Sequence, residues 1–297
     1  MIFPISAVHL NPVILILVGF VVGVFGGFFG VGGSFIAGPA LFGLGLPMNF
    51  VVGTDLAHLV GKSLVAARRH AELGHIDLKL AGLMMVSTIP GVELGARGLE
   101  QLKKAGHLTH VLGSIFVFVL IFITIFMAVE VWLTLRAKRP RGSAQKNRDH
   151  SAFSGIAKKV QRLPFPPYVR LPKSNIQRIS FWSIAVVSFI SGIFSGFLGG
   201  GAGYIRMPSM VYLLGVPTHI AIGTDLFEII VSASYGTFTH ALKGNVDILV
   251  ALVMHTGAAV GAQIGAQLTQ YFNGVWIRLA FIPLPLIGVF ILLHRMI

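Results

Sequence analysis

The 297-residue chain contains no cysteine, and only 11% of its residues are charged. The absence of cysteine excludes a disulfide scaffold, an iron–sulfur cluster, a zinc site with thiolate ligands and a cysteine nucleophile. Soluble proteins carry about 25% charged residues, so this chain has too little charge to cover a globular surface in water. Hydrophobic residues make up 55%, and the mean hydropathy is +0.83. The composition predicts an all-α polytopic membrane protein.

Acidic residues are also scarce, with 10 Asp and Glu against 23 Lys and Arg. Twelve of the basic residues fall in the segment 136–178, which contains five prolines and a single acid, Asp149. A basic, proline-rich segment between hydrophobic spans is typical of an extended cytoplasmic loop under the positive-inside rule. We prefer this interpretation to nucleic-acid binding. It also places residues 61–79, the turn at Lys243 and both termini in the cytoplasm, and it leaves Arg278 with a few other basic residues on the opposite side.

The hydrophobic stretches predict eight membrane spans. Residues 1–54 contain no Asp, Glu, Lys or Arg, and a hydrocarbon core about 30 Å thick needs only about 20 helical residues. The chain must therefore turn within this stretch, and Gly30-Val31-Gly32-Gly33 is the expected place. A second span follows, interrupted by Pro39 and Pro47. Further spans are expected at about 80–98, 108–132, 180–199, 204–236, 247–270 and 276–294.

The sequence is internally repeated. The segment Gly27–Ile36 aligns with Gly196–Ile205, and Gly53-Thr54-Asp55 aligns with Gly223-Thr224-Asp225. The same register continues through His70/His240, Gly74/Gly244 and Asp77/Asp247. We therefore predict a first transmembrane repeat over 1–135, a basic loop over 136–178 and a second transmembrane repeat over 179–297, each repeat with four spans. Simple crossings would make the repeats parallel, whereas re-entrant helices would invert one of them, and both arrangements remain open.

The two glycine-rich breaks occupy equivalent places in the repeats. Irregular backbone at membrane depth is tolerated only inside protein or around a wet cavity, and paired broken helices point to a transporter binding site. Helix N-termini that begin at such breaks suit an anion. The candidate substrate-binding residues are Gly30, Gly32, Gly33, Ser34, Gly199, Gly200, Gly201, Gly203, Arg206, Thr54 and Thr224. Close helix packing through small residues is the alternative, and we prefer it for Gly91/Gly95 and Gly261/Gly265.

Burying an ionisable residue in apolar surroundings costs free energy, and such residues are usually functional. The candidates for proton coupling or gating are Asp55, Asp225, His58, Lys62 and Glu228. Both aspartates reach the membrane centre only if the helices break near Pro47 and Pro217; otherwise helix capping or an interhelical hydrogen bond explains the Thr-Asp pairs. Lys62 could simply extend to the headgroups. Arg206 is the best single cation for an anionic substrate, with an interfacial arginine as the alternative.

The doubled Gly-Phe-(Phe/Leu)-Gly-x-Gly segment with its following proline, and the doubled Gly-Thr-Asp, resemble the TauE/SafE (sulfite exporter) family of membrane permeases. The Gly74-His75-Ile76-Asp77 and Gly244-Asn245-Val246-Asp247 turns add to the resemblance, which covers nearly the whole chain apart from the first ten residues and the basic loop. It implies seven to nine transmembrane helices in a bacterial inner membrane. It also implies movement, usually outward, of sulfur-containing anions such as sulfite or organosulfonates.

The leading functional hypothesis is therefore a secondary transporter that exports a small sulfur-containing anion by alternating access around the paired breaks. Import or exchange of another anion, such as thiosulfate or a carboxylate, is the alternative within transport. An intramembrane enzyme is less favoured because no His-Glu-x-x-His motif and no metal-ligand spacing occur, and a membrane scaffold that acts through the basic loop is a further alternative. No cofactor or metal is expected. The expected partners are the anion and lipid, and proton coupling through Asp55 or Asp225 is optional.

Overall fold

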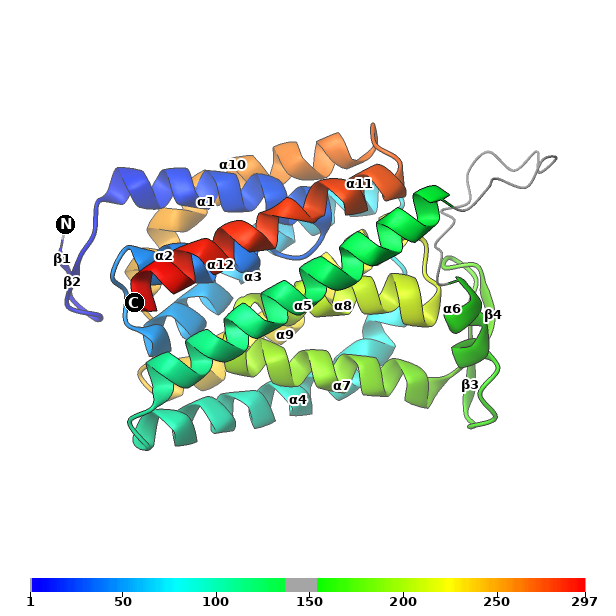
Figure 1. Cartoon of the computed structure of the whole chain (residues 1–297), viewed down its shortest axis with the longest axis horizontal. Helices are drawn as coiled ribbons and strands as arrows, with labels where there is room; N and C mark the ends of the chain where they lie inside the picture. Colours follow the sequence, from blue (N-terminus) through cyan, green and yellow to red (C-terminus); the bar gives the residue numbers. More distant parts are fainter. Residues whose placement is uncertain (1, 137–153, 297) are drawn as a thin grey trace.

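The computed structural model describes residues 2–136 and 154–296, and this part of the chain is predominantly helical (Figure 1). The long helices are α1 (Pro12–Phe29), α3 (Met48–Glu72), α4 (Leu78–Lys104), α5 (Leu108–Arg136), α7 (Phe181–Leu198), α9 (Thr218–Leu242) and α10 (Ile248–Thr269). The chain ends with α11 (Gly274–Phe281) and α12 (Pro283–Met296), which together form one further membrane-length segment.

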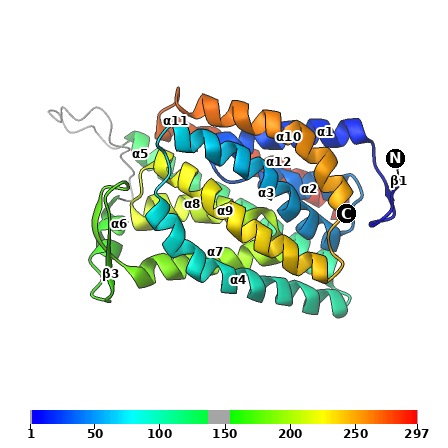
Figure 2. The ribbon, with the colours of Figure 1, turned by 180° about the vertical axis from the view of Figure 1, so that it is seen from behind.

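Length and composition make seven of these segments able to cross a membrane, namely α1, α3, α4, α5, α7, α10 and the pair α11–α12. This confirms an all-α polytopic membrane protein. Helix α9 has the same 25-residue length as α3, and the two lie side by side in the middle of the molecule (Figure 2). The eighth span remains a prediction that depends on α9.

A short helix follows each glycine break. Helix α2 (Ser34–Gly43) follows the first break; the 3₁₀ turn η1 (Gly200–Ala202), α8 (Gly203–Ser209) and the π-helical turn η2 (Met210–Leu214) follow the second. Three glycines at each break have φ between +64° and +79°, a left-handed conformation that side chains other than glycine rarely adopt. This geometry reverses the chain: a Cβ built on Gly33 would lie 2.4 Å from Val22 O, so Gly33 has already returned to pack against the middle of α1.

The prediction that one long, interrupted span follows each break is therefore wrong. The residues after each break form a short re-entrant helix, a bend at Leu44–Pro47 or Gly215–Pro217, and then a separate long helix, α3 or α9. Proline fits at the entry to these helices because its fixed φ suits the first turn. The predicted cytoplasmic segment 61–79 is likewise mostly helical, since α3 continues to Glu72.

Contacts at the two ends of the molecule show that the halves run in opposite directions. The α3–α4 turn lies against the start of α9, where Asp77 N donates a 2.9 Å hydrogen bond to Thr224 Oγ1. The α9–α10 turn lies against the start of α3, where Asp247 N donates a 2.9 Å hydrogen bond to Thr54 Oγ1. Because α3 is about 37 Å long, its start and its end lie at opposite ends of the molecule. The equivalent contacts are therefore inverted rather than parallel.

This inversion corrects the predicted assignment of charge to the two sides. Lys79 Nζ donates to Arg170 O at 2.9 Å, so the basic loop and the α3–α4 turn share one end, called the loop end here. The opposite end, called the terminal end, holds both termini: Ser6 Oγ donates to Asp247 Oδ2, and α12 ends near Gly45 (Figure 1). The described part of the basic loop, residues 154–178, therefore lies at the opposite end of the molecule from the C-terminus and the Lys243 turn.

The loop end is also more structured than an extended loop. Residues 137–153 of the predicted basic loop lie outside the described residues. The rest forms α6 (Ser154–Gln161) and a hairpin of β3 (Tyr168–Leu171) and β4 (Ile176–Ser180). Leu171, Ile176 and Ile179 are buried, which explains why this basic segment folds against the helices. At the other end, β1 (Ile2–Phe3) pairs with β2 (Val8–His9).

Helices of opposite halves cross closely through glycine. A Cβ built on Gly95 of α4 would lie 2.1 Å from Ile193 O of α7, and one on Gly265 of α10 would lie 2.0 Å from Val24 O of α1. Gly91 and Gly261 make the same kind of approach. These positions act in close helix packing, as predicted, and they interlock the two halves.

We expect Gly95→Leu to destabilise the protein strongly, because no side chain fits between α4 and α7; overpacking of this kind costs about 1–3 kcal/mol or more. Gly82→Leu on the same helix is the matched control, since a Cβ at Gly82 meets no atom within 4 Å. Thermal unfolding of both variants in detergent measures the difference. Equal midpoints for the two variants would contradict the close crossing.

Candidate functional site

The two glycine breaks meet at the centre of the molecule. We call residues 30–34 and 199–203 together the junction. A Cβ built on Gly32 would lie 2.5 Å from Leu59 of α3, 3.5 Å from Ile229 of α9 and 3.8 Å from Gly200 O. A Cβ on Gly203 would lie 2.7 Å from Val31 Cα. Leu59 and Ile229 are mid-helix residues, so the junction lies between the middles of α3 and α9.

The junction is closed in this structure. Residues 30–34 and 199–203 are all buried. A groove of about 400 Å³ lies between α5 and α8–η2, and no junction residue lines it. The expected open chamber is therefore not seen here. A solute could reach the junction only after helices move.

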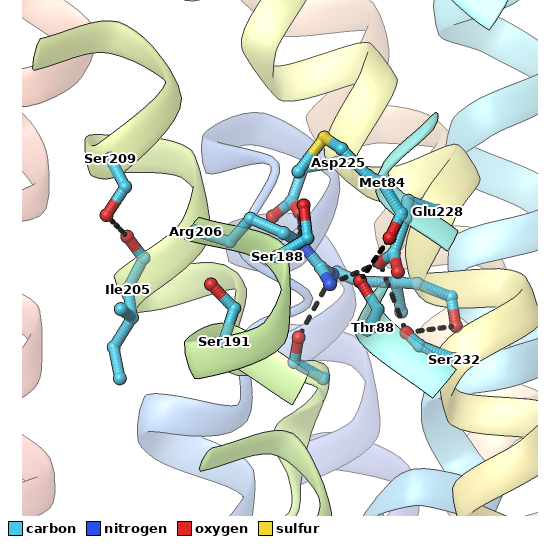
Figure 3. A network of polar contacts seen from close by, with 12 residues as sticks. Met84, Thr88, Ser188, Ser191, Ile205, Arg206, Ser209, Asp225, Glu228 and Ser232 are labelled. Atoms are coloured by element: carbon cyan, nitrogen blue, oxygen red, sulfur yellow. Dashed lines mark hydrogen bonds and ion pairs between the residues drawn. The ribbon is translucent and has the colours of Figure 1, made fainter. Parts of the chain in front are cut away.

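The second half places a buried ion network beside the junction (Figure 3). The Arg206 guanidinium contacts the carboxylates of Asp225 and Glu228, which lie one turn apart on α9. Arg206 Nη2 also donates a 3.0 Å hydrogen bond to Gly201 O, and Ser232 Oγ donates to Glu228 Oε2 at 3.2 Å. Arg206, Asp225 and Glu228 are all fully buried. Arg206 therefore fastens the break to α9, and two carboxylates already compensate its charge. The alternative of an interfacial arginine is wrong.

The first half has a different arrangement. Asp55, His58 and Lys62 share one face of α3, and each is at most 2% exposed. Lys62 Nζ lacks a hydrogen-bond partner among the described residues, whereas the His58 ring interacts with the backbone of Ala251 on α10. Lys62 therefore does not extend to the headgroups. Ala37 stands where the second half has Arg206, so this half has no brace from its short helix to α3.

Each aspartate lies at the N-terminus of a short helix. Asp225 Oδ2 is 2.7 Å from a Cβ built on Gly203, the first residue of α8, and Asp55 Oδ2 is 3.6 Å from one built on Gly200. Ser34, the first residue of α2, lies beside Asp55: its Oγ is 2.8 Å from the same Gly200 Cβ. Helix N-termini attract negative charge. The breaks at Pro47 and Pro217 thus bring both aspartates to the centre, where the chain's own carboxylates occupy the positions expected for an anion.

Thr54 and Thr224 make structural contacts. Their hydroxyls accept the hydrogen bonds from Asp247 N and Asp77 N described above. Asp77 and Asp247 in turn cap the N-termini of α4 and α10. The interhelical hydrogen bond given as the alternative for these threonines is the one observed.

The structure also holds a buried ion pair that the sequence analysis missed. Arg278 of α11 and Glu130 of α5 are fully buried, with Arg278 Nε 3.5 Å from Glu130 Oε2. Tyr212 of η2 donates to the same oxygen at 3.0 Å, and Arg278 Nη1 donates to Thr218 Oγ1 at 2.6 Å. The predicted surface position of Arg278 is therefore wrong. An acid within the apolar stretch 108–132 was the available signal.

Histidines at the loop end and asparagines at the terminal end are equivalent in the repeat. The His75 and His219 rings lie 5.2 Å apart, and Asn49 Nδ2 donates to Asn245 Oδ1 at 3.1 Å. Burial, and then the positive charge of His219 and Lys173, lowers the pKa of His75 to about 4. His75 is therefore neutral at pH 7. Each end is closed by one such cross-half pair.

Paired re-entrant helices, inverted halves and charged side chains buried among apolar helices define a membrane transporter. The profile of the family described as Sulfite exporter TauE/SafE matches residues 15–291. The chain therefore belongs to the TauE/SafE family.

Curated relatives cover nearly the same length. The chain is 26% identical over 268 residues to the probable membrane transporter protein YunE of Bacillus subtilis, covering 87% of this chain and 88% of that protein. It is 27% identical over 265 residues to YjnA of the same organism, a second probable membrane transporter protein, covering 87% and 91%. No solved structure matches.

Arg206→Met should be strongly destabilising, because it leaves two buried carboxylates without their cation; breaking a buried pair in this way costs about 3–5 kcal/mol. Arg97→Met, which removes an arginine 68% exposed from its pair with Glu93, is the control and should change little. The triple variant Arg206→Met/Asp225→Leu/Glu228→Leu should recover part of the loss. Thermal midpoints in detergent test this series. A wild-type midpoint for Arg206→Met would contradict the bracing role.

Proposed function

We propose that the protein is a secondary transporter that exports a small sulfur-containing anion, such as sulfite or an organosulfonate. Membership of the sulfite exporter family supports the substrate class. The observation that carries the proposal is the meeting of two glycine breaks next to buried Lys62 and Arg206. Helix N-termini and buried cations are the groups that stabilise an anion away from water.

Export needs no nucleotide. A membrane potential that is negative inside favours exit of an anion by about 2.3 kcal/mol per charge per 100 mV, and the chain has no phosphate-loop motif. Export of a monoanion can therefore run on the potential alone. The central carboxylates also allow proton coupling, which would add the proton gradient as a second driving force.

The positive-inside rule gives the orientation. The loop end carries Arg68, Arg69, Lys79 and the basic loop, and the terminal end carries fewer basic residues. We therefore place the loop end in the cytoplasm and both termini on the outer side of a bacterial inner membrane. This orientation replaces the predicted cytoplasmic termini.

Alternating access follows from the inverted halves. Rocking of one half against the other would open the His75–His219 end while the Asn49–Asn245 end stays closed, and then the reverse. In each open state the junction would face one side of the membrane. The closed junction corresponds to an occluded state between the two open states.

Flux in proteoliposomes tests the function. With an inside-negative potential we expect outward movement of sulfite or an organosulfonate in preference to a simple carboxylate. The panel is sulfite, thiosulfate, sulfoacetate and acetate. Movement of none of the sulfur anions, or driven uptake only, would contradict the proposed export.

Two locked variants extend this test, because the native chain has no cysteine to interfere. Asn49→Cys/Asn245→Cys and His75→Cys/His219→Cys, each joined by a short thiol cross-linker, should stop flux, and reductive release of the linker should restore it. The four single-cysteine variants are the controls. Unchanged flux after complete cross-linking at either end would contradict alternating access.

A further inference from the structure

The two halves differ in how far their buried charges are satisfied. In the second half, Arg206 contacts Asp225, Glu228 and Gly201 O. In the first half, Lys62 Nζ, Asp55 Oδ1 and Ser63 Oγ are buried without a close hydrogen-bond partner among the described residues. In the second half, Asp225 Oδ2 and Glu228 Oε1 are also without one, but the other oxygen of each carboxylate contacts Arg206. Buried polar groups are normally satisfied. This cluster of unsatisfied groups therefore requires an explanation.

Asp55, His58 and Lys62 follow one another along α3, which passes the N-terminus of α2. Asp55 lies beside Ser34 there, and its carboxylate interacts electrostatically with Lys62 two turns further along α3. His58 lies between them in sequence and also senses the Lys62 charge. His255 of α10 packs on the same stretch, since a Cβ built on Gly61 would lie 2.3 Å from its Cε1. The Asp55 carboxylate thus interacts with the Ser34 hydroxyl and the Lys62 ammonium, whereas His58 interacts with His255 and the backbone of Ala251 on α10.

The charges at the centre do not balance. Among the described residues near the junction, three acidic side chains (Asp55, Asp225 and Glu228) face two basic ones (Arg206 and Lys62). An added anion would increase this excess, and each uncompensated buried charge costs several kcal/mol. An anion can be held only if one carboxylate leaves or takes up a proton. Asp55 is the carboxylate without an arginine partner.

We propose that the first half binds the anion through Lys62 and Ser34, and that Asp55 occupies this subsite when the anion is absent. The proposal rests on the proposed function and refines it. An ammonium and a hydroxyl can both donate hydrogen bonds to the oxygens of a sulfite or sulfonate group. Arg206 is then a positioning residue that holds the second break, and substrate binding displaces or protonates Asp55.

The displacement makes binding depend on pH. The groups that face Asp55 and Lys62 are His58 on α3, Ser34 on α2, Tyr204 on α8 and His255 on α10, with the Arg206 network across the junction. Protonation of Asp55, His58 or His255 favours an anion. Affinity should therefore rise as the pH falls, and Asp55→Asn should weaken this dependence.

Direct binding of ³⁵S-labelled sulfite, thiosulfate and sulfoacetate to the purified full-length protein tests the proposal. Lys62→Met should weaken binding by about tenfold or more, the loss expected for a charge-assisted hydrogen bond, whereas Lys62→Arg should keep most of it. Asp55→Asn should tighten binding at pH 7.5 because the competing carboxylate is gone. Arg97→Met, which removes an exposed arginine away from the junction, is the control and should bind like the wild type.

The outcomes of these experiments distinguish failure of the subsite from failure of the transport function. Wild-type affinity in Lys62→Met, or no gain in Asp55→Asn, overturns the subsite and leaves the transport function standing. A wild-type protein that neither binds nor moves any sulfur anion overturns the proposed function and the subsite with it. If Lys62→Met does not fold, Ser34→Ala and Asp55→Asn decide, with weaker and tighter binding expected respectively.

Discussion

Backbone groups without partners are not tolerated in hydrocarbon, and this constraint governs the centre of the molecule. Alone, each glycine break would leave backbone N–H and C=O groups without partners, which costs free energy. Packed against each other between α3 and α9, the two breaks bury one another. The aspartates at the N-termini of the short helices supply negative charge where the helix ends are positive. The inverted halves and the glycine crossings of α1 with α10 and of α4 with α7 hold this arrangement together.

The two halves share one architecture but differ in how their buried charges are compensated. The second half fastens its break to α9 through Arg206, so this part of the junction is braced. The first half leaves the buried Lys62 ammonium without a hydrogen-bond partner among the described residues, near a displaceable carboxylate. A transporter needs both properties, because a firm frame keeps the helices aligned and a loosely compensated site can exchange its own carboxylate for a solute.

The doubled motifs were sufficient to predict the repeat and the two breaks, and they singled out both aspartates without fixing their depth. They did not predict the sides of the membrane, because the direction of each half depends on whether residues 35–47 cross the bilayer or return. Contacts between residues distant in sequence could not be predicted either. Thr54 bonds to Asp247, and Glu130 pairs with Arg278, and neither contact leaves a local pattern. The sequence predicted Arg206 as a cation of the site. Its two carboxylate partners lie on another helix, so the pairing was not predicted.

Accessibility of Ser34 tests the central claim most directly. Ser34→Cys would be the only thiol in the chain, and it lies fully buried at the junction. In vesicles, a membrane-impermeant anionic thiol reagent should label this cysteine slowly from either side, and a transported sulfur anion should protect it from both. Labelling from one side only, or labelling that no such anion slows, would contradict a junction that binds the anion and opens alternately to each side.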